Sequence, residues 1–192
     1  MSPCKIILKN ILALTVSLFL TTACQNETSG ARGNDTPLSA IHTQIAQDYP
    51  TLKHITPREL TARLNDPELV LLDMRSANEV RVSHIDGAVF LSADIRPDAL
   101  YATFPNGLKD KHIILYCSVG RRSSETAHRL EKHFLALGAK SIHNLEGGIF
   151  RWHNERRPLM RDDDRTDEIH PYNRAWGRYI ARKEQIRYNN SD

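Results

Sequence analysis

The chain has 192 residues, of which 40% are hydrophobic, and its formal net charge at pH 7 is +3. This length and apolar content fit a single globular domain of ordinary size with short extensions. The charge is small and the basic residues are interspersed with acidic ones, which argues against nucleic acid as a partner.

The first residues have the pattern of an export signal. Lys5 and Lys9 precede a short apolar stretch over residues 11–20, and small residues at 21–23 lead to Cys24. The end of this segment resembles the lipobox of bacterial lipoproteins, in which the cysteine is lipidated and becomes the first mature residue. That family more often has leucine three places before the cysteine, where this chain has threonine.

The lipobox resemblance implies a signal peptide over residues 1–23 and acyl chains such as palmitate on Cys24. An uncleaved membrane anchor and a plain secretory signal remain alternatives, although the apolar stretch is shorter than the ~20 residues of a spanning helix. Gln25, in place of an aspartate, resembles the outer-membrane sorting class. We therefore expect an exported protein held by lipid at the periplasmic face of a bacterial membrane, with the outer membrane as the expected one.

Residues 24–39 have the composition of a flexible tether, because Asn, Ser, Thr and Gly dominate them. A short helix is expected around residues 41–49, and another begins at Thr56, where a capping box with Glu59 is combined with proline at the first helical position. Buried strands are predicted over residues 69–72, 88–91, 112–116 and 141–145. This alternation predicts an α/β domain with a mostly parallel sheet, whose ligands gather at the carboxyl ends of the strands.

The turn Cys117-Ser118-Val119-Gly120-Arg121-Arg122 lies between the strand at 112–116 and a helical pattern that opens at Ser123 and stops at Gly138. Backbone N–H groups in such a turn point inward, and the helix dipole adds partial positive charge. This field favours the thiolate form of Cys117, and the two arginines would attract an anionic substrate or leaving group. The sequence therefore predicts a nucleophilic cysteine rather than a buried structural one.

Cys117 would be the only free thiol of the mature protein. The chain has three cysteines, of which Cys4 would leave with the signal peptide and Cys24 would carry lipid, so no disulfide framework is possible. The nine histidines are scattered and Cys-x-x-Cys is absent from the sequence, so we expect no metal ion. Gly147-Gly148 lacks the surrounding pattern of a nucleotide-binding loop, and we expect no cofactor.

Four ordered blocks of sequence resemble the rhodanese domain of sulfurtransferases. They are Asp73-Met74-Arg75 with Glu79, then His84-Ile85-Asp86-Gly87-Ala88, then the Cys117 turn with Ser123, then Asn144-Leu145-Glu146-Gly147-Gly148-Ile149-Phe150-Arg151-Trp152 with Pro158-Leu159. The resemblance implies a single rhodanese domain over residues 40–160, with a mostly parallel five-stranded central sheet flanked by helices. It also implies that Cys117 carries persulfide sulfur and that residues 118–122 complete its substrate-binding loop.

The activity implied by this resemblance is sulfur transfer. Cys117 would take sulfane sulfur from a small donor such as thiosulfate and pass it to a thiol or cyanide acceptor. A rhodanese fold kept only for binding a partner or sensing sulfur is one alternative. A cysteine phosphatase or arsenate reductase is another, but those related enzymes have one more residue between cysteine and arginine than the four residues 118–121 of this chain.

The acidic and basic residues of the first two blocks are interpreted as structural support. Asp73, Arg75 and Glu79 are expected to form an ion-pair network that joins strand, loop and helix, in preference to acid–base machinery. His84 is expected to hydrogen-bond the turn before Gly87, with a general-base role as the less favoured alternative.

Residues 161–192 form a charged and aromatic C-terminal extension. Four apolar residues of the extension are expected to share one helical face, namely Trp176, Tyr179, Ile180 and Ile186. Docking of the extension on the domain is the favoured interpretation, and binding of a partner or a lipid surface is the alternative.

Overall fold

The computed structural model describes residues 37–188, which belong to one compact unit, Gly33–Asp192. The predicted signal peptide, the predicted lipidation site Cys24 and nearly all of the predicted tether lie outside the described residues. None of the helices within residues 37–188 combines the length and the hydropathy that crossing a lipid bilayer requires.

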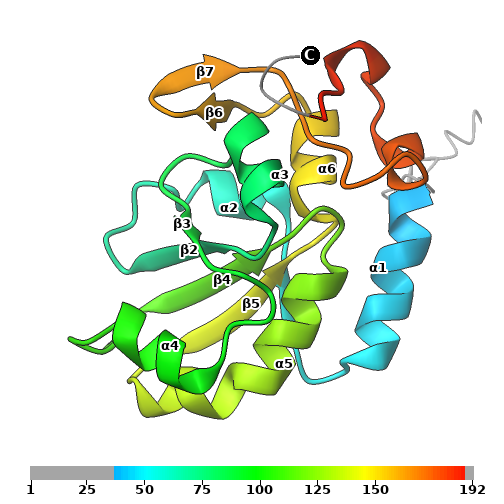
Figure 1. Ribbon diagram of the computed structural model, residues 1–192. Helices are drawn as coiled ribbons and strands as arrows, with labels where there is room; N and C mark the ends of the chain where they lie inside the picture. The colour runs from blue at the N-terminus through cyan, green and yellow to red at the C-terminus, as the bar shows by residue number, and fades with distance from the viewer. Residues whose placement is uncertain (1–36, 189–192) are drawn as a thin grey trace, which may run out of the picture. The chain divides into compact units, whose positions relative to one another are not determined.

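A five-stranded sheet lies at the centre of the fold, and every neighbouring pair of its strands is parallel (Figure 1). In spatial order the strands are β1 (Lys53–Ile55), β5 (Ser141–Leu145), β4 (His112–Tyr116), β2 (Leu69–Asp73) and β3 (Val89–Phe90). The predicted α/β fold is confirmed, and the sheet is parallel throughout rather than mostly. The short edge strand β1 was not predicted, because only one of its three residues is buried and it carries no apolar pattern.

Six α-helices accompany the sheet within the described residues. They are α1 (Pro37–Asp48), α2 (Pro57–Thr61), α3 (Ala77–Val82), α4 (Pro97–Thr103), α5 (Arg121–Ala136) and α6 (Gly148–Asn154). Apolar residues of α4 and α5 pack on one face of the sheet, and those of α2 and α6 pack on the other. The predicted capping box is present, since the Thr56 hydroxyl accepts from the Glu59 N–H and the Glu59 carboxylate accepts from the Thr56 N–H.

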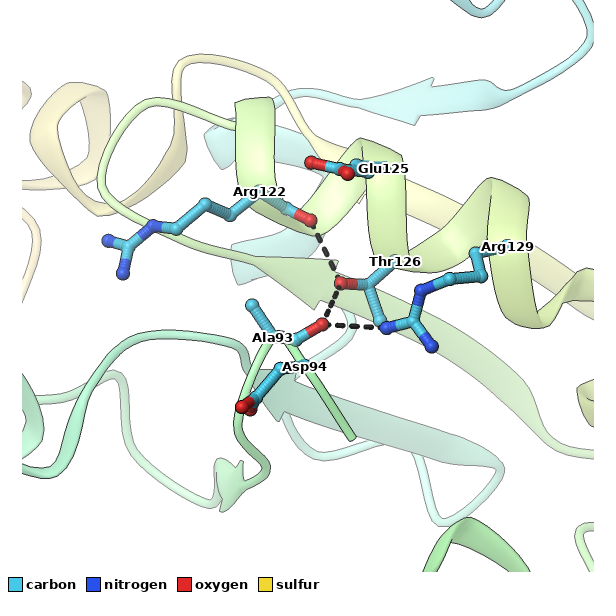
Figure 2. A pocket seen from close by; sticks show the side chains of 6 residues that line it. All are labelled: Ala93, Asp94, Arg122, Glu125, Thr126 and Arg129. Atoms are coloured by element: carbon cyan, nitrogen blue, oxygen red, sulfur yellow. Dashed lines mark hydrogen bonds between the residues drawn. The ribbon is translucent and has the colours of Figure 1, made fainter. Parts of the chain in front are cut away.

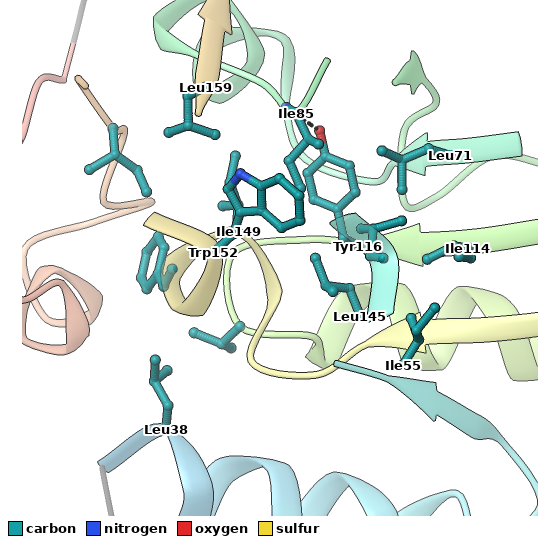
Figure 3. Close-up of a cluster of buried hydrophobic side chains, with 14 of the residues drawn as sticks. Leu38, Ile55, Leu71, Ile85, Ile114, Tyr116, Leu145, Ile149, Trp152 and Leu159 are labelled. Atoms are coloured by element: carbon teal, nitrogen blue, oxygen red, sulfur yellow. Dashed lines mark hydrogen bonds between the residues drawn. The ribbon is translucent and has the colours of Figure 1, made fainter. Parts of the chain in front are cut away.

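The central strand β4 divides the apolar core between the two faces. Ile113 and Leu115 belong to the cluster under α5, while Ile114 and Tyr116 belong to the cluster that contains Trp152 of α6 (Figure 3). All five side chains are fully buried. This alternation follows from the two-residue period of a strand, and burial of both faces explains why the sequence shows a continuous apolar run there.

The C-terminal extension packs on the domain, as expected. An antiparallel hairpin of β6 (Leu159–Arg161) and β7 (Asp164–Thr166) spans the boundary between the domain and the extension. The extension continues through two 3₁₀ turns, η1 (Trp176–Tyr179) and η2 (Lys183–Gln185). The prediction of one helical face is wrong, because Ile180 has an extended backbone that separates the two turns. Ile180 is nevertheless fully buried against the core cluster that includes α6.

Candidate active site

Cys117 follows β4 directly, at the carboxyl edge of the sheet, where the sequence predicted the site to lie. Gly120 adopts a left-handed conformation with φ 97° and forms the N-cap of α5. The helix therefore begins two residues earlier than predicted, and residues 121–122 belong to its first turn rather than to a loop. Ser124 fixes this early start, because both its N–H and its hydroxyl donate to the Gly120 carbonyl, at 3.1 and 2.7 Å.

The sulfur of Cys117 is buried beside the N-terminus of α5. The residue is 1% exposed, and Sγ accepts a hydrogen bond from the Gly120 N–H at 3.3 Å. The partial positive charge of the helix N-terminus lies beside this sulfur. Cys117 lies at the wall of a cavity of about 170 Å³. The geometry thus places the buried Cys117 at the wall of a small cavity.

Helix α6 begins against the backbone of the cysteine loop. The N–H groups of Ile149 and Phe150 donate to the carbonyls of Cys117 and Ser118, at 2.9 and 3.0 Å. A Cβ atom on Gly148 would lie 2.3 Å from the Cys117 carbonyl oxygen, and Gly148 has φ 56°. Only glycine fits this contact, so the second glycine of Gly147-Gly148 serves the close approach of helix and loop.

Glu79 of α3 binds the side chains of two residues of the cysteine loop. Its fully buried carboxylate accepts from the Ser118 hydroxyl at 2.7 Å and from two guanidinium nitrogens of Arg122 at 2.8 and 2.9 Å. The same carboxylate caps α3 by accepting from the Ser76 N–H at 3.0 Å. Burial alone would raise the pKa of Glu79, but the hydrogen bonds and charge of Arg122 outweigh burial and lower it to about 2. The carboxylate is therefore a permanent anion under the loop.

The two arginines have different partners. Burial alone would lower the pKa of Arg122, but its hydrogen bonds to Glu79 and the nearby negative groups raise it, and its guanidinium lies 4.6 Å from the centre of the Tyr172 ring. Arg121 is 53% exposed, and its nearest carboxylate is Asp48 of α1 at 3.7 Å. Both line the cavity. Because Arg122 is neutralised by Glu79, Arg121 is the more available cation for an anionic ligand.

Asp73 and Arg75 form a buried ion pair next to this support. Arg75 donates to the Asp73 carboxylate through Nε and Nη2, the shortest contact being 2.7 Å, and the two side chains are at most 1% exposed. Arg75 also donates to the Ser83 carbonyl at 2.5 Å. It reaches Glu79 only through the backbone carbonyl, at 3.5 Å. The Glu79 carboxylate thus faces the cysteine loop, a contact that the sequence reasoning did not predict.

His84 lies away from the cavity. Its Nδ1 is buried and has no hydrogen-bond partner within residues 37–188, so the expected bond to the turn before Gly87 is not formed. The backbone of His84 instead exchanges two hydrogen bonds with Met160 of β6, each 2.8 Å long. His84 therefore ties the end of α3 to the C-terminal hairpin. The part of the chain that the structure describes holds no cluster of three or more His, Cys, Asp or Glu side chains suited to a metal ion.

Two cavity residues were missed by the sequence reasoning. Tyr172 and Trp176 of the C-terminal extension line the Cys117 cavity together with residues of the loop. Trp176 was predicted only as part of a helical face, and Tyr172 was given no role, because nothing local in the sequence links them to a cysteine more than fifty residues earlier. A second, larger cavity of about 460 Å³ shares Arg122 but is not lined by Cys117 (Figure 2).

The comparisons with known proteins identify the family of the domain. A family model described as "Rhodanese-like domain" matches residues 56–155, just over half of the chain. Among curated proteins, the tRNA uridine(34) hydroxylase of Erwinia tasmaniensis is 31% identical over 106 residues, which is 54% of this chain and 29% of that protein. The enzyme of the same name from Enterobacter sp. (strain 638) is 33% identical over 107 residues, 55% of this chain and 30% of that protein. The chain spans less than a third of the length of these relatives.

Among solved structures, the thiosulfate sulfurtransferase of Pseudomonas aeruginosa superposes with a TM-score of 0.53 at 17% identity. The match covers 77% of this chain and 27% of that one. At this identity the likeness concerns the fold alone.

Proposed function

The chain belongs to the rhodanese family and has its α/β fold, and from this premise we propose that it is a sulfurtransferase with Cys117 as the sulfur carrier. One observation carries the proposal: the Cys117 sulfur accepts the Gly120 N–H at the start of α5 and borders a small cavity that also contains two arginines. A thiolate held in this way is a nucleophile placed beside an anion-attracting surface.

In the first half-reaction the Cys117 thiolate attacks the outer sulfur of a donor such as thiosulfate. A new sulfur–sulfur bond forms on Cys117, the donor's sulfur–sulfur bond breaks, and sulfite leaves with the bonding electron pair. In the second half-reaction an acceptor thiolate or cyanide attacks the terminal sulfur of the persulfide, and Cys117 leaves as a thiolate. No external oxidant or reductant is consumed, and the scheme is ping-pong.

The surrounding residues have distinct proposed roles. Gly120 and the N-terminus of α5 stabilise negative charge on the sulfur in both half-reactions. Arg121 attracts the anionic end of the donor, since its contact with Asp48 is long and exposed. Ser118 and Arg122 act through Glu79, which holds the loop in one geometry, so we regard them as positioning residues.

The alternatives receive less support. A cysteine phosphatase would have one more residue between cysteine and arginine than the four residues 118–121 of this chain, and the Arg122 guanidinium at the end of this loop is engaged by Glu79 through two hydrogen bonds. A purely binding module would not need a sulfur held by a backbone N–H. Hydroxylation of tRNA is the named activity of relatives of which this chain matches less than a third, and no contact of the described residues favours it.

Mass spectrometry after incubation with thiosulfate tests the proposal. The wild type should gain one sulfur atom on Cys117, and Cys117→Ser should lose both this adduct and turnover. Sulfur transfer that survives in Cys117→Ser would refute the assignment. Cys117-dependent hydrolysis of an aryl phosphate, without sulfur transfer, would favour the phosphatase alternative instead.

We also propose that the protein is exported and anchored in the outer membrane by lipid on Cys24, on the support of residues 1–24 of the sequence. Labelled palmitate should enter the wild type, and Cys24→Ser should abolish labelling. Absence of label from the wild type would show that the anchor is wrong, without bearing on sulfur transfer.

A further inference from the structure

The C-terminal extension forms part of the wall of the cavity that Cys117 also lines. The cavity is lined by Cys117, Ser118, Val119, Arg121, Arg122, Tyr172 and Trp176. The first five residues lie within the segment 56–155 that matches the family, whereas the two aromatic residues lie beyond it. Part of the reaction space is therefore built by residues outside the family match.

Tyr172 is held in place from both sides. Its backbone adopts φ 65°, which is uncommon for a residue with a side chain, and its N–H donates to Nδ1 of His170 at 3.0 Å. His170 is buried, and its ring meets the edge of Tyr188 at 5.9 Å between centroids. The Tyr172 ring lies over the Arg122 guanidinium. Tyr172 is 46% exposed, and these contacts hold its ring against Arg122 at the wall of the cavity.

Trp176 belongs to the turn η1, which is anchored to helix α6. The Trp176 N–H donates to Asn173 Oδ1 at 3.0 Å, and its ring packs on Tyr179 at 5.4 Å between centroids. The carbonyl of Tyr179 accepts from the Asn154 side chain at 2.8 Å, and Ile180 is fully buried just beyond. Tyr172 and Trp176, which we call the aromatic wall, thus belong to the packed structure of the extension.

The wall leaves little room beside the sulfur. The cavity of about 170 Å³ is well below the roughly 300–1,000 Å³ of pockets that hold drug-sized ligands. Cys117 does not line the neighbouring cavity of about 460 Å³, and the Arg122 side chain extends away from the other labelled residues of that cavity (Figure 2). A small inorganic anion fits such a space, whereas a tripeptide thiol is larger than the cavity and would have to pass the two aromatic residues that line it.

We infer that Tyr172 and Trp176 are specificity-determining residues, which restrict Cys117 to small inorganic sulfur donors and exclude peptide persulfides. The inference rests on the proposed sulfurtransferase function. Thiosulfate and glutathione persulfide yield the same Cys117 persulfide, since the thiolate attacks the outer sulfur and either sulfite or glutathione thiolate leaves with the electron pair. The ratio of their rates therefore compares access to one common reaction.

The first experiment compares donors in the full-length protein. In the double variant Tyr172→Ala/Trp176→Ala, the ratio of kcat/KM for thiosulfate to kcat/KM for glutathione persulfide should fall at least tenfold. The single variant Tyr172→Ala should move the ratio in the same direction by less. Tyr101→Ala is the matched control, since Tyr101 is a 40% exposed surface tyrosine that does not line the cavity. A ratio that stays within twofold of the wild type in both variants would overturn the inference.

The second experiment does not depend on sulfur transfer. Cys117 is alkylated with iodoacetamide as the small reagent or with fluorescein maleimide as the bulky one. Peptide mass spectrometry measures the rate of each reaction at Cys117. The double variant should accelerate the bulky reagent at least tenfold relative to the small one, and Tyr101→Ala should leave the ratio unchanged. If the ratio of the two alkylation rates is unchanged in the double variant, Tyr172 and Trp176 do not restrict access to Cys117. If the alkylation ratio changes but the wild type transfers no sulfur, the proposed function is wrong, although Tyr172 and Trp176 still restrict access to Cys117.

Discussion

Replacement of Glu79 by glutamine tests whether one carboxylate supports the cysteine loop. The variant keeps the size of the side chain but removes the charge that faces Arg122 and Ser118. It leaves the Arg122 guanidinium, whose side chain is 28% exposed, without an anionic partner. Removing one partner of a buried ion pair typically costs about 3–5 kcal/mol of stability.

The pKa of Glu79 gives an independent magnitude for the same contact. A fall from the ordinary 4.5 to about 2 corresponds to about 3 kcal/mol of stabilisation of the ionised form. Because the pKa is lowered in the folded state, this stabilisation is complete above the ordinary value and is lost as the pH falls through about 2. At pH 3.5 about 2 kcal/mol of it should remain.

Urea denaturation of the wild type and Glu79→Gln measures both expectations. At pH 7 the variant should lose about 3 kcal/mol in free energy of unfolding, and the difference should shrink as the pH falls below 4.5. Glu131→Gln, an exposed change on α5, is the matched control and should have no effect. A loss below about 1 kcal/mol, or a loss that does not change with pH, would refute the assignment of the loop's support to the Glu79 charge.

Three further changes have defined outcomes. Gly148→Ala should lower the melting temperature and slow persulfide formation at least tenfold, because the new Cβ would meet the Cys117 carbonyl at 2.3 Å; wild-type rates would contradict the close approach. Burial lowers the pKa of His170, so protonation of His170 opposes folding. The contribution of neutral His170 to the free energy of unfolding is complete above pH 6.5 and should be lost as the pH falls. Between pH 7 and 5, His170→Asn should therefore lose less free energy of unfolding than the wild type loses. Arg121→Ala should raise the KM for thiosulfate about two- to fivefold with little change in kcat, as expected for an exposed charge contact worth about 0.5–1 kcal/mol; an unchanged KM would exclude Arg121 from donor binding.

The parts of the fold that local sequence determines were predictable. Strand β4 is buried on both faces and therefore appears as a continuous apolar run, and Gly138 adopts φ 95° just past the end of α5, where the sequence placed the stop of that helix. The three-residue strand β1 carries no such pattern. It exists because its backbone pairs with β5, a contact between segments about ninety residues apart. Pairing of this kind leaves no local periodicity to read.

The same distinction applies to the site. Cys117 was recognisable because the residues that hold it, from the strand to Gly120, are its neighbours in sequence. Glu79 was noticed as part of a motif, but its alignment with Arg122 depends on the packing of α3 beneath the loop, across 43 residues. A charge motif identifies groups that are paired, whereas only the tertiary structure decides which pairs form.

The proposed function and the inferred wall of Tyr172 and Trp176 together assign reactivity and donor selection to different parts of this molecule. Glu79 and the start of α5 hold the Cys117 loop from within the segment that matches the family, so reactivity does not require the extension to touch the sulfur. Tyr172 contacts Arg122, which Glu79 holds in place. A substitution in the extension therefore changes the lining of the cavity first, and it affects the cysteine loop only through Arg122. In a fold built this way, residues beyond the family match can alter which donors reach the cysteine while the residues that activate it stay the same. Replacement of Tyr172 and Trp176 should then change the ratio of the kcat/KM values for the two donors, while the sulfur-transfer step itself stays the same for each donor.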